Sequence, residues 1–256
     1  MTEPVRVAVE DGVMRLTFAR PDKKNAITNA MYGVLADALE QAETDSDIRA
    51  VLIHGEGGVF TSGNDLMDFA AQATGAFTGE RHVLRFLSAL AWANKPLVAA
   101  VEGLAVGVGT TMLLHCDLVF VAKDAKLTTP FVNLALVPEA ASSLLLPQRI
   151  GHARAFAMFA LGEALDGEQA ATLGVANAAL PAGEVLACAE DAARKLAQRP
   201  LGAVVATKKL MREAAFIQEV MDAEGKIFGE RLLTAEAREA FSAFVERRPP
   251  DFSKVA

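Results

Sequence analysis

The residues of this chain that are best suited to chemistry lie in two glycine-containing loops. The first loop covers residues 60–66 (Phe-Thr-Ser-Gly-Asn-Asp-Leu), and the second covers 102–109 (Glu-Gly-Leu-Ala-Val-Gly-Val-Gly). Each follows an apolar run that predicts a buried strand, and each leads into a segment that can begin a helix. Such loops point backbone N–H groups outward from a rigid sheet. Two of them converging on one point would form an oxyanion hole, which stabilises negative charge on a carbonyl oxygen.

The second loop has three interpretations. Gly107 and Gly109 could let a helix cross close to a strand. They could also begin a dinucleotide fingerprint, but Met112 holds the third glycine position, and no acidic residue is convincingly placed about twenty positions later. The third interpretation is that the flanking glycines leave the N–H of Val108 uncovered as a donor.

The first loop also has simpler explanations. Ser62 and Gly63 could form a plain turn, and Asn64 and Asp65 could cap the helix that follows. A nucleophilic Ser62 is disfavoured because Phe60 replaces the first glycine of the Gly-x-Ser-x-Gly elbow. Asp65 is better explained as a capping or bracing residue than as a catalytic one.

Glu139 is a carboxylate isolated in a mostly apolar stretch, residues 131–146. It could lie at a helix N-terminus, where a negative charge complements the helix dipole. It could equally serve as a general base, because apolar surroundings raise the pKa of a carboxyl group. The residues alone leave both roles open.

Composition excludes several functions. A chain of 256 residues with 52% hydrophobic residues can bury a substantial core, and its net charge of −7 argues against a nucleic-acid partner. No apolar run reaches the length of a membrane span, and the N-terminus shows no secretory pattern. The histidines and the two cysteines lack metal-ligand spacing. We therefore expect a cytoplasmic enzyme with reduced thiols, no metal, and no membrane or nucleic-acid partner.

Hydrophobic periodicity predicts an α/β core followed by helices. We expect a hairpin of residues 6–10 and 13–19, a helix that begins after its N-cap Thr28, and strands at 50–54, 97–101, 117–122 and 127–129. Helices are expected at 67–94 and 109–115, then at 142–150, 153–161, 167–173, 183–198, 201–215 and 216–246, with 175–180 extended. This pattern predicts a core of residues 1–190 and a C-terminal helical region of residues 191–256. The amphipathic last segment must pack on the core or on another subunit.

The order and spacing of several short motifs resemble the crotonase family, also called the enoyl-CoA hydratase/isomerase family, over nearly the whole chain. The motifs are Arg20-Pro21 followed by Asn25-Ala26, Phe60-x-Ser62-Gly63-x-Asp65-Leu66, Lys95-Pro96 followed by Ala99-Ala100-Val101-x-Gly103, Gly107-x-Gly109, Cys116-Asp117, Leu136-x-Pro138, Ala206-Thr207-Lys208 and Phe244-x-Glu246-x-Arg248. The resemblance implies a ClpP/crotonase fold of repeated β-β-α turns. It also implies C-terminal helices that form a homotrimer or a dimer of trimers.

The resemblance assigns the two oxyanion donors to the backbone N–H groups of Asn64 and Val108. The two glutamates that hydratases of the family use correspond to Thr111 and Phe131, and neither side chain can transfer a proton usefully at neutral pH. Glu139 matches the catalytic glutamate of the peroxisomal-type Δ3,Δ2-enoyl-CoA isomerase branch. We therefore expect an isomerase in which Glu139 moves a proton. The alternatives are another crotonase-type reaction such as enoyl-CoA hydration, or a CoA-ester-binding protein without catalysis.

The resemblance also implies how an acyl-CoA substrate is held, with no cofactor beyond the coenzyme A of the substrate itself. Of the neighbouring Lys23 and Lys24, Lys24 is the better candidate for a phosphate contact, although it could be an ordinary solvated lysine. Lys208 and Lys209 could approach the nucleotide end, and residues 67–80 could line the acyl pocket. The residues assigned to substrate or CoA binding are Lys24, Ala26, Ser62, Gly63, Asp65, Leu66, Gly107 and Phe131.

Overall fold

A mixed β-sheet forms the centre of the molecule in a computed structural model, which describes residues 3–68 and 79–255. Its strand order is β1-β2-β3-β4-β6-β9. The strands are β1 (Val5–Glu10), β2 (Val13–Phe18), β3 (Ala50–Gly55), β4 (Leu97–Val101), β6 (Leu118–Ala122) and β9 (Ala178–Leu180). The β1/β2 hairpin is antiparallel and every other pairing in this sheet is parallel. The expected hairpin and the strands at 50–54, 97–101 and 117–122 are confirmed.

A smaller sheet carries the second glycine-containing loop. It has the order β5-β7-β8, with β5 (Leu104–Val106), β7 (Lys126–Thr128) and β8 (Leu165–Asp166). Strands β5 and β8 were not predicted, because two or three residues are too short for a periodic pattern. β5 forms the middle of this loop and ends at Val106, directly before Gly107.

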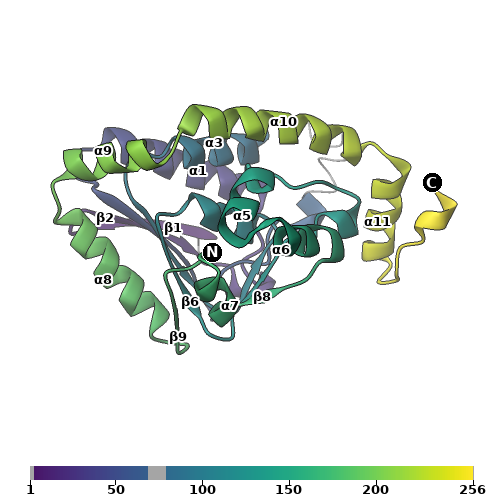
Figure 1. The fold of residues 1–256 in the computed structure, drawn as a ribbon, viewed down its shortest axis with the longest axis horizontal. Helices are drawn as coiled ribbons and strands as arrows, with labels where there is room; N and C mark the ends of the chain where they lie inside the picture. The colour runs from purple at the N-terminus through teal and green to yellow at the C-terminus, as the bar shows by residue number, and fades with distance from the viewer. Residues whose placement is uncertain (1–2, 69–78, 256) are drawn as a thin grey trace.

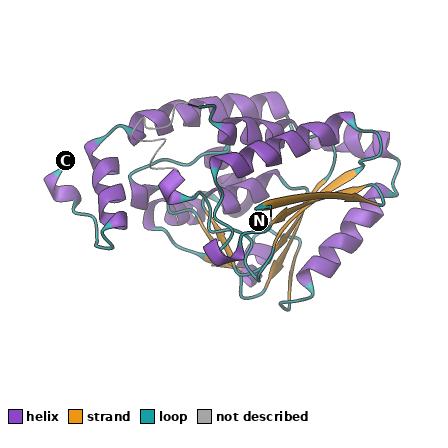
Figure 2. Cartoon of the chain, turned by 180° about the vertical axis from the view of Figure 1, so that it is seen from behind, coloured by secondary structure: helices purple, strands orange, loops and turns teal. Residues whose placement is uncertain are grey.

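Buried strands and a covering helix form the core. All five residues of β4 are buried. A continuous apolar run of this kind is typical of a parallel strand covered on both faces. Helix α8 (Val185–Ala197) packs against β3, β4 and β6. Figure 2 shows this helix along one side of the sheet, with most of the other helices across it.

Two packed helices lie between the sheet and the C-terminal region. Thr28 caps α1 (Asn29–Thr44) by accepting a hydrogen bond from the backbone N–H of Met31, which confirms the expected N-cap. Helix α3 (His82–Trp92) packs against α1, as Figure 1 shows. Most of the rest of the helix expected over 67–94 lies in residues 69–78, outside the described residues.

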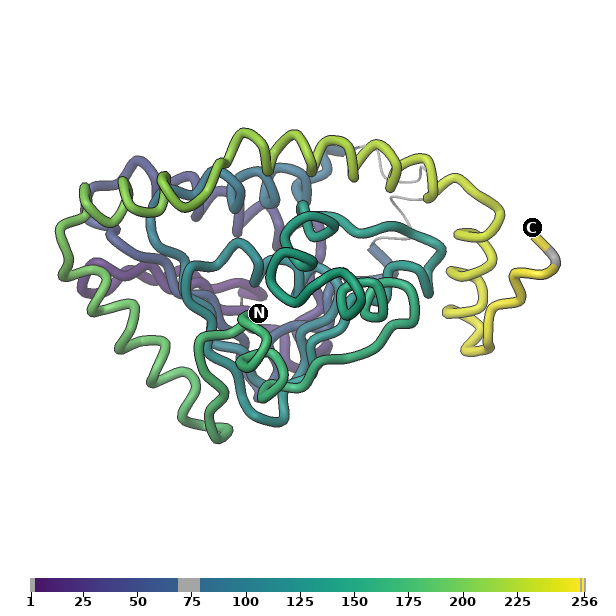
Figure 3. Tube along the Cα trace, viewed as in Figure 1, coloured from purple at the N-terminus to yellow at the C-terminus, as the bar shows by residue number. Residues whose placement is uncertain are grey.

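The short helix α4 (Val108–Thr111) follows the second loop. The second half of the chain is largely helical, as expected. It contains α5 (Ser142–Ile150), α6 (His152–Phe156) followed by a π-helical turn (Ala157–Leu161), α7 (Gly167–Thr172), α9 (Leu201–Met211), α10 (Ala214–Leu232) and α11 (Ala235–Val245). Helix α10 runs along α3, and α11 stands at the far end of the molecule (Figure 3). The single segment expected over 216–246 is divided where Thr234 caps α11.

Helix α8 spans the boundary expected between residues 190 and 191 and packs on the sheet along its length, so the division into two regions stays a prediction. The α/β class with C-terminal helices is confirmed. No helix in the described ranges is long and apolar enough to cross a membrane. Both cysteines are free thiols, with Cys116 buried and Cys188 half-buried.

Candidate active site

The two glycine-containing loops lie against each other. The N–H of Thr61 donates to the carbonyl of Leu104 at 2.9 Å, and the N–H of Val106 donates to the carbonyl of Thr61 at 3.2 Å. Gly63 has a φ of 84°, and a Cβ atom there would lie 2.5 Å from the carbonyl oxygen of Val106. Only glycine fits this position, because it tolerates positive φ and has no side chain. The loops therefore converge, as an oxyanion hole between them requires.

The N–H groups of Asn64 and Val108 are free of the backbone network. Val108 begins α4, where a backbone N–H has no partner inside the helix. The adjacent N–H groups are occupied: Gly63 donates to Thr61 Oγ1, and Gly107 donates to the carbonyl of Thr128. Within residues 3–68 and 79–255, the N–H groups of Asn64 and Val108 donate to no acceptor. They are thus available to a ligand.

The loop cavity, a hollow of about 680 Å³, lies in front of the two loops. Its walls contain Lys24, Ala26, Ser62, Gly63, Asn64, Asp65, Leu66, Gly107, Val108 and Phe131. The fold thus brings together the residues assigned to this site by sequence, except Glu139, Lys208 and Lys209. Lys23 also lines this cavity, and like Lys24 it is exposed to solvent.

Glu139 lines a second hollow, the Glu139 cavity, of about 240 Å³. Three residues line both cavities, namely Asn64, Asp65 and Phe228. Leu84, Leu87 and Met221 contribute apolar surface on the Glu139 side. Asn64 therefore borders both the loop cavity and the cavity that Glu139 lines.

Burial makes Glu139 an unusually basic carboxylate. Its Oε1 accepts a hydrogen bond from Thr111 Oγ1 at 2.5 Å. Loss of bulk water raises the pKa of Glu139 to about 7, the charge of Glu224 adds to the increase, and the Thr111 hydrogen bond opposes it. A base with a pKa near the working pH is ionised in part and still gains from taking a proton.

The structure removes the simpler explanation of Glu139. Its carboxylate does not cap α5, which begins at Ser142. Instead, the N–H groups of Ala141 and Ser143 donate to the carboxylate of Glu224, at 2.6 and 2.9 Å. The dipole of that helix is therefore complemented by Glu224, and Glu139 stays directed at Thr111 and the cavity.

Tyr32 fixes the side chain of Asn64. The Tyr32 hydroxyl on α1 lies 2.5 Å from Asn64 Oδ1 and donates to it. Burial, together with the charge of Glu139, raises the pKa of Tyr32 well above its usual value, so the hydroxyl stays protonated. Tyr32 therefore holds the side chain of a loop residue that lines both cavities.

Asp65 braces the first loop, as expected. Its carboxylate pairs with Arg20 at 2.7 Å and accepts from the N–H of Met67 at 3.2 Å. Arg20 also donates to the carbonyl of Ala26 at 3.0 Å. The ion pair thus joins the Lys24–Ala26 turn to the first loop, and both line the loop cavity.

One sequence-based assignment is wrong. Lys208 does not approach the loop cavity, because it is buried and donates to Asp117 at 2.7 Å and to the carbonyl of Lys95 at 2.9 Å. Lys209 is exposed on α9, and neither lysine lines the loop cavity. Lys208 instead fastens α9 to the ends of β4 and β6.

Sequence reasoning missed three aromatic residues at the site. Tyr32 and Phe228 line the Glu139 cavity, and Phe228 and Phe244 line the loop cavity. Tyr32 lies on the buried face of α1, and the phenylalanines lie on α10 and α11. The apolar stripe of the last segment was the available signal, but it does not specify which residues reach the site. In the described ranges, no group of three or more His, Cys, Asp or Glu residues is placed to hold a metal ion.

Comparison with known proteins identifies the class. The model of the family described as "Enoyl-CoA hydratase/isomerase" matches residues 8–255. The chain is 34% identical to 1,2-epoxyphenylacetyl-CoA isomerase of Escherichia coli K12, covering 99% of each chain. It is 33% identical to Enoyl-CoA delta isomerase 2 of Rattus norvegicus, covering 96% of this chain and 64% of that protein.

The solved structure of Pseudomonas aeruginosa OdaA is 50% identical to this chain and superposes with a TM-score of 0.90, covering 96% of this chain and all (100%) of the other. The chain therefore belongs to the enoyl-CoA hydratase/isomerase family and has the crotonase fold. It is an enzyme of that family, whose members include both hydratases and isomerases.

Proposed function

We propose that the protein is a Δ3,Δ2-enoyl-CoA isomerase, which moves the double bond of a 3-enoyl thioester into conjugation with the carbonyl group. The observation that carries the proposal is the carboxyl group of Glu139. It lines the cavity that Asn64 borders, it binds Thr111, and its pKa is raised to about 7. The family relationship supplies the thioester substrate class.

A single base is sufficient for this reaction. The Glu139 carboxylate removes a proton from C2, and the electrons move onto the thioester oxygen, which becomes an enolate. The N–H groups of Asn64 and Val108 donate to that oxygen. Glu139, now a carboxylic acid, then delivers the proton to C4, and the double bond forms between C2 and C3. Donors placed where charge develops act most strongly away from water.

The surroundings of Glu139 support isomerisation over hydration. Hydration requires one group to activate water and another to deliver a proton. Thr111 and Phe131 occupy the positions of the two hydratase glutamates, and here they serve as a hydrogen-bond donor to Glu139 and as a wall of the loop cavity. Three aspartates, Asp65, Asp68 and Asp222, also line the Glu139 cavity.

These aspartates already have partners. Asp65 pairs with Arg20, Asp68 accepts from the N–H of Asn29, and Asp222 accepts from Gln218 at 2.8 Å. Glu139 is the better base, because the three aspartates already accept hydrogen bonds or ion pairs and burial raises the pKa of Glu139 to about 7.

The loop cavity is the proposed place for the coenzyme A arm. Lys23 and Lys24 stand at this cavity and carry positive charge on a protein whose net charge is −7. Local cations attract the phosphates of a CoA thioester despite the overall charge. The apolar wall that includes Leu66 and Phe131 suits the pantetheine chain.

We also propose that the C-terminal helices associate into the trimer that the family resemblance implies. Large apolar side chains on this region are strongly exposed: Leu210 is 89% exposed, Leu233 70% and Val245 64%. Exposed apolar groups of this size favour a protein–protein interface. Light scattering of the purified protein tests the proposal, and a monomer would contradict it.

The direct test of the proposed activity follows the absorbance of the conjugated product formed from a 3-enoyl-CoA. We expect turnover by the wild type and a loss of about 10²–10⁴-fold in Glu139→Gln, the usual contribution of a general base. Rapid hydration of a 2-enoyl-CoA instead would favour the hydratase alternative. Binding of the thioester without turnover would favour a protein that only binds CoA esters.

A further inference from the structure

The backbone that follows Glu139 is held in an unfavourable conformation. Ala140 has a φ of 60° and Ala141 a φ of 54°, and both are almost fully buried. For residues with a side chain, this left-handed region costs roughly 1–2 kcal/mol each. Two such residues in succession persist only where surrounding contacts fix them. Relaxation of this pair would move the carboxyl group of Glu139.

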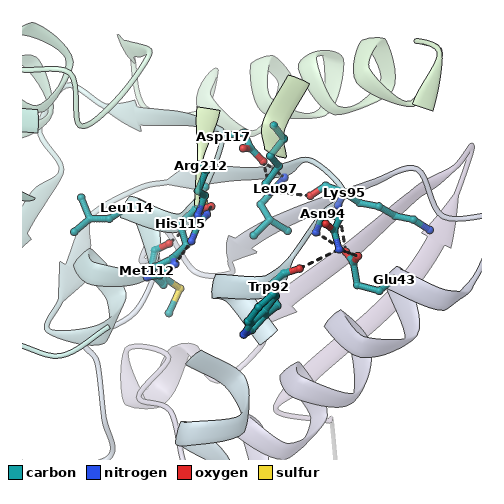
Figure 4. A network of polar contacts seen from close by, with 12 residues as sticks. Glu43, Trp92, Asn94, Lys95, Leu97, Met112, Leu114, His115, Asp117 and Arg212 are labelled. Atoms are coloured by element: carbon teal, nitrogen blue, oxygen red, sulfur yellow. Dashed lines mark hydrogen bonds and ion pairs between the residues drawn. The ribbon is translucent and has the colours of Figure 1, made fainter. Parts of the chain in front are cut away.

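His115 fixes the pair from one side. It is fully buried, and its Nε2 lies 2.7 Å from the carbonyl oxygen of Ala140. Arg212 lies 2.5 Å from His115 Nδ1 and also donates to the carbonyl of His115 at 3.0 Å (Figure 4). A guanidinium only donates hydrogen bonds, so Nδ1 is the acceptor and Nε2 carries the proton. His115 therefore donates to Ala140.

The charge state of His115 is also fixed. Burial, and then the charge of Arg212, lower the pKa of His115 to about 3. With a pKa this low, the ring is neutral near pH 7. His115 is therefore a neutral ring in one tautomer, and its Nε2–H donates to the carbonyl of Ala140.

Glu224 holds the same segment from the other side. This residue of α10 is 7% exposed, and its carboxylate accepts from the N–H groups of Ala141 and Ser143. Side chains from distant parts of the sequence thus bind three backbone groups shortly after Glu139, namely the carbonyl of Ala140 and the N–H groups of Ala141 and Ser143. Of the described residues that line the loop cavity or the Glu139 cavity, none is His115, Arg212 or Glu224.

We propose that His115, Arg212 and Glu224 form a positioning cradle that holds residues 140–143 and thereby aims the Glu139 carboxyl group at the substrate. The cradle acts through the backbone and does not touch the reacting atoms. It makes the C-terminal part of the chain, which supplies Arg212 and Glu224, a determinant of catalytic geometry. This inference rests on the proposed role of Glu139.

The test compares two substitutions of His115 in the full-length protein. His115→Gln keeps a donor beside an acceptor, so it can bind both Ala140 and Arg212, whereas His115→Leu removes both contacts. A displacement of about 1 Å in a catalytic group can cost about 10²-fold in rate. We expect His115→Leu to lower kcat about 10–100-fold with KM for the thioester within about twofold, and His115→Gln to recover most of the loss.

Two further variants complete the design. Glu224→Gln removes a charged acceptor from the opposite side and also removes the charge that raises the pKa of Glu139. Measured well above that pKa, where the Glu139 carboxyl group is ionised in both proteins, the variant is expected to lower kcat without changing KM. His152→Leu is the matched control, because His152 is an exposed histidine at the start of α6 and has no part in the site. Its kinetics should equal those of the wild type. Circular dichroism and thermal unfolding establish that each variant is folded.

Amide hydrogen exchange separates this inference from the proposed function, because it needs no turnover. We expect exchange at residues 141–143 to accelerate at least about tenfold in His115→Leu and to stay near wild type in His115→Gln. If the wild type fails to isomerise a 3-enoyl-CoA, the proposed function fails while the exchange result still tests the cradle. A folded His115→Leu variant with unchanged exchange and unchanged kcat would overturn the cradle.

Discussion

The hydrogen bond from Thr111 to Glu139 sets the pH range of the proposed reaction. Thr111 Oγ1 donates to Glu139 Oε1 at 2.5 Å and stabilises the ionised carboxylate. Thr111→Val keeps the approximate shape of the side chain and removes the donor. The carboxylate then loses a favourable contact, so its pKa must rise above the wild-type value of about 7.

The size of the effect follows from the energy of such a contact. A hydrogen bond to a charged group contributes about 1.5–3 kcal/mol, and one pKa unit corresponds to about 1.4 kcal/mol. The substitution should therefore raise the pKa of Glu139 by about 1–2 units. At pH 7 the ionised fraction falls from about one half to between about one in ten and one in a hundred. We expect kcat/KM at pH 7 to fall about 5–50-fold.

The assay is the pH dependence of kcat/KM for isomerisation of a 3-enoyl-CoA. The acidic limb should move from about pH 7 to about pH 8–9 in Thr111→Val, and the two profiles should approach each other at higher pH. Thr111→Ser retains the hydroxyl group and should restore the wild-type limb. Thr172→Val, at an exposed site on α7, is the matched control. An unchanged limb in a folded Thr111→Val variant would refute the assignment of Glu139 as the base.

Three other predictions concern separate parts of the site. Tyr32→Phe removes the donor to Asn64, and the loss of about 1 kcal/mol should lower kcat/KM about fivefold in a steady-state assay; an unchanged value would show that this contact does not position the loop. Lys24→Ala should raise KM for an acyl-CoA about threefold at low salt and leave KM for the matching acyl-pantetheine unchanged, whereas equal effects on both substrates would contradict a phosphate contact. Glu139→Gln should stabilise the protein at pH 8 and not at pH 4. The pKa of Glu139 is higher in the folded state than in the unfolded chain, so the wild type loses up to about 3 kcal/mol of stability as the pH rises from about 4.5 to about 7. Thermal unfolding at the two pH values measures this, and an equal shift at both would contradict the raised pKa.

The buried strands and the helix caps could be predicted because each depends on local sequence. β3 and β4 are apolar runs, and Thr28 precedes an amphipathic helix. The two loops could be located because Gly63 and Gly107 adopt positive φ, which few other residues tolerate. Their convergence required the parallel pairing of Thr61 with Ala105, which no local pattern indicates.

The misplaced and missed residues share one physical cause. A helical segment in the sequence does not show which of its polar side chains turns inward. Lys208 was therefore expected near the nucleotide end of the substrate, whereas its side chain donates to Asp117. Tyr32 and Phe228 reach the Glu139 cavity only because α1 and α10 pack around it. Likewise, Glu224 caps α5 through a contact between residues far apart in the chain. Such long-range contacts depend on tertiary packing, which a single sequence does not reveal.

The central claim is that Glu139 carries a proton from C2 to C4 of the substrate. Isomerisation of a 3-enoyl-CoA deuterated at C2, followed by mass and NMR analysis of the product, measures this transfer directly. Because the cavity withdraws the carboxyl group from bulk water, we predict that a measurable share of the first-turnover product carries deuterium at C4, and that Glu139→Gln forms almost no product. A product whose C4 hydrogen comes wholly from solvent, formed at the wild-type rate by Glu139→Gln, would contradict the claim.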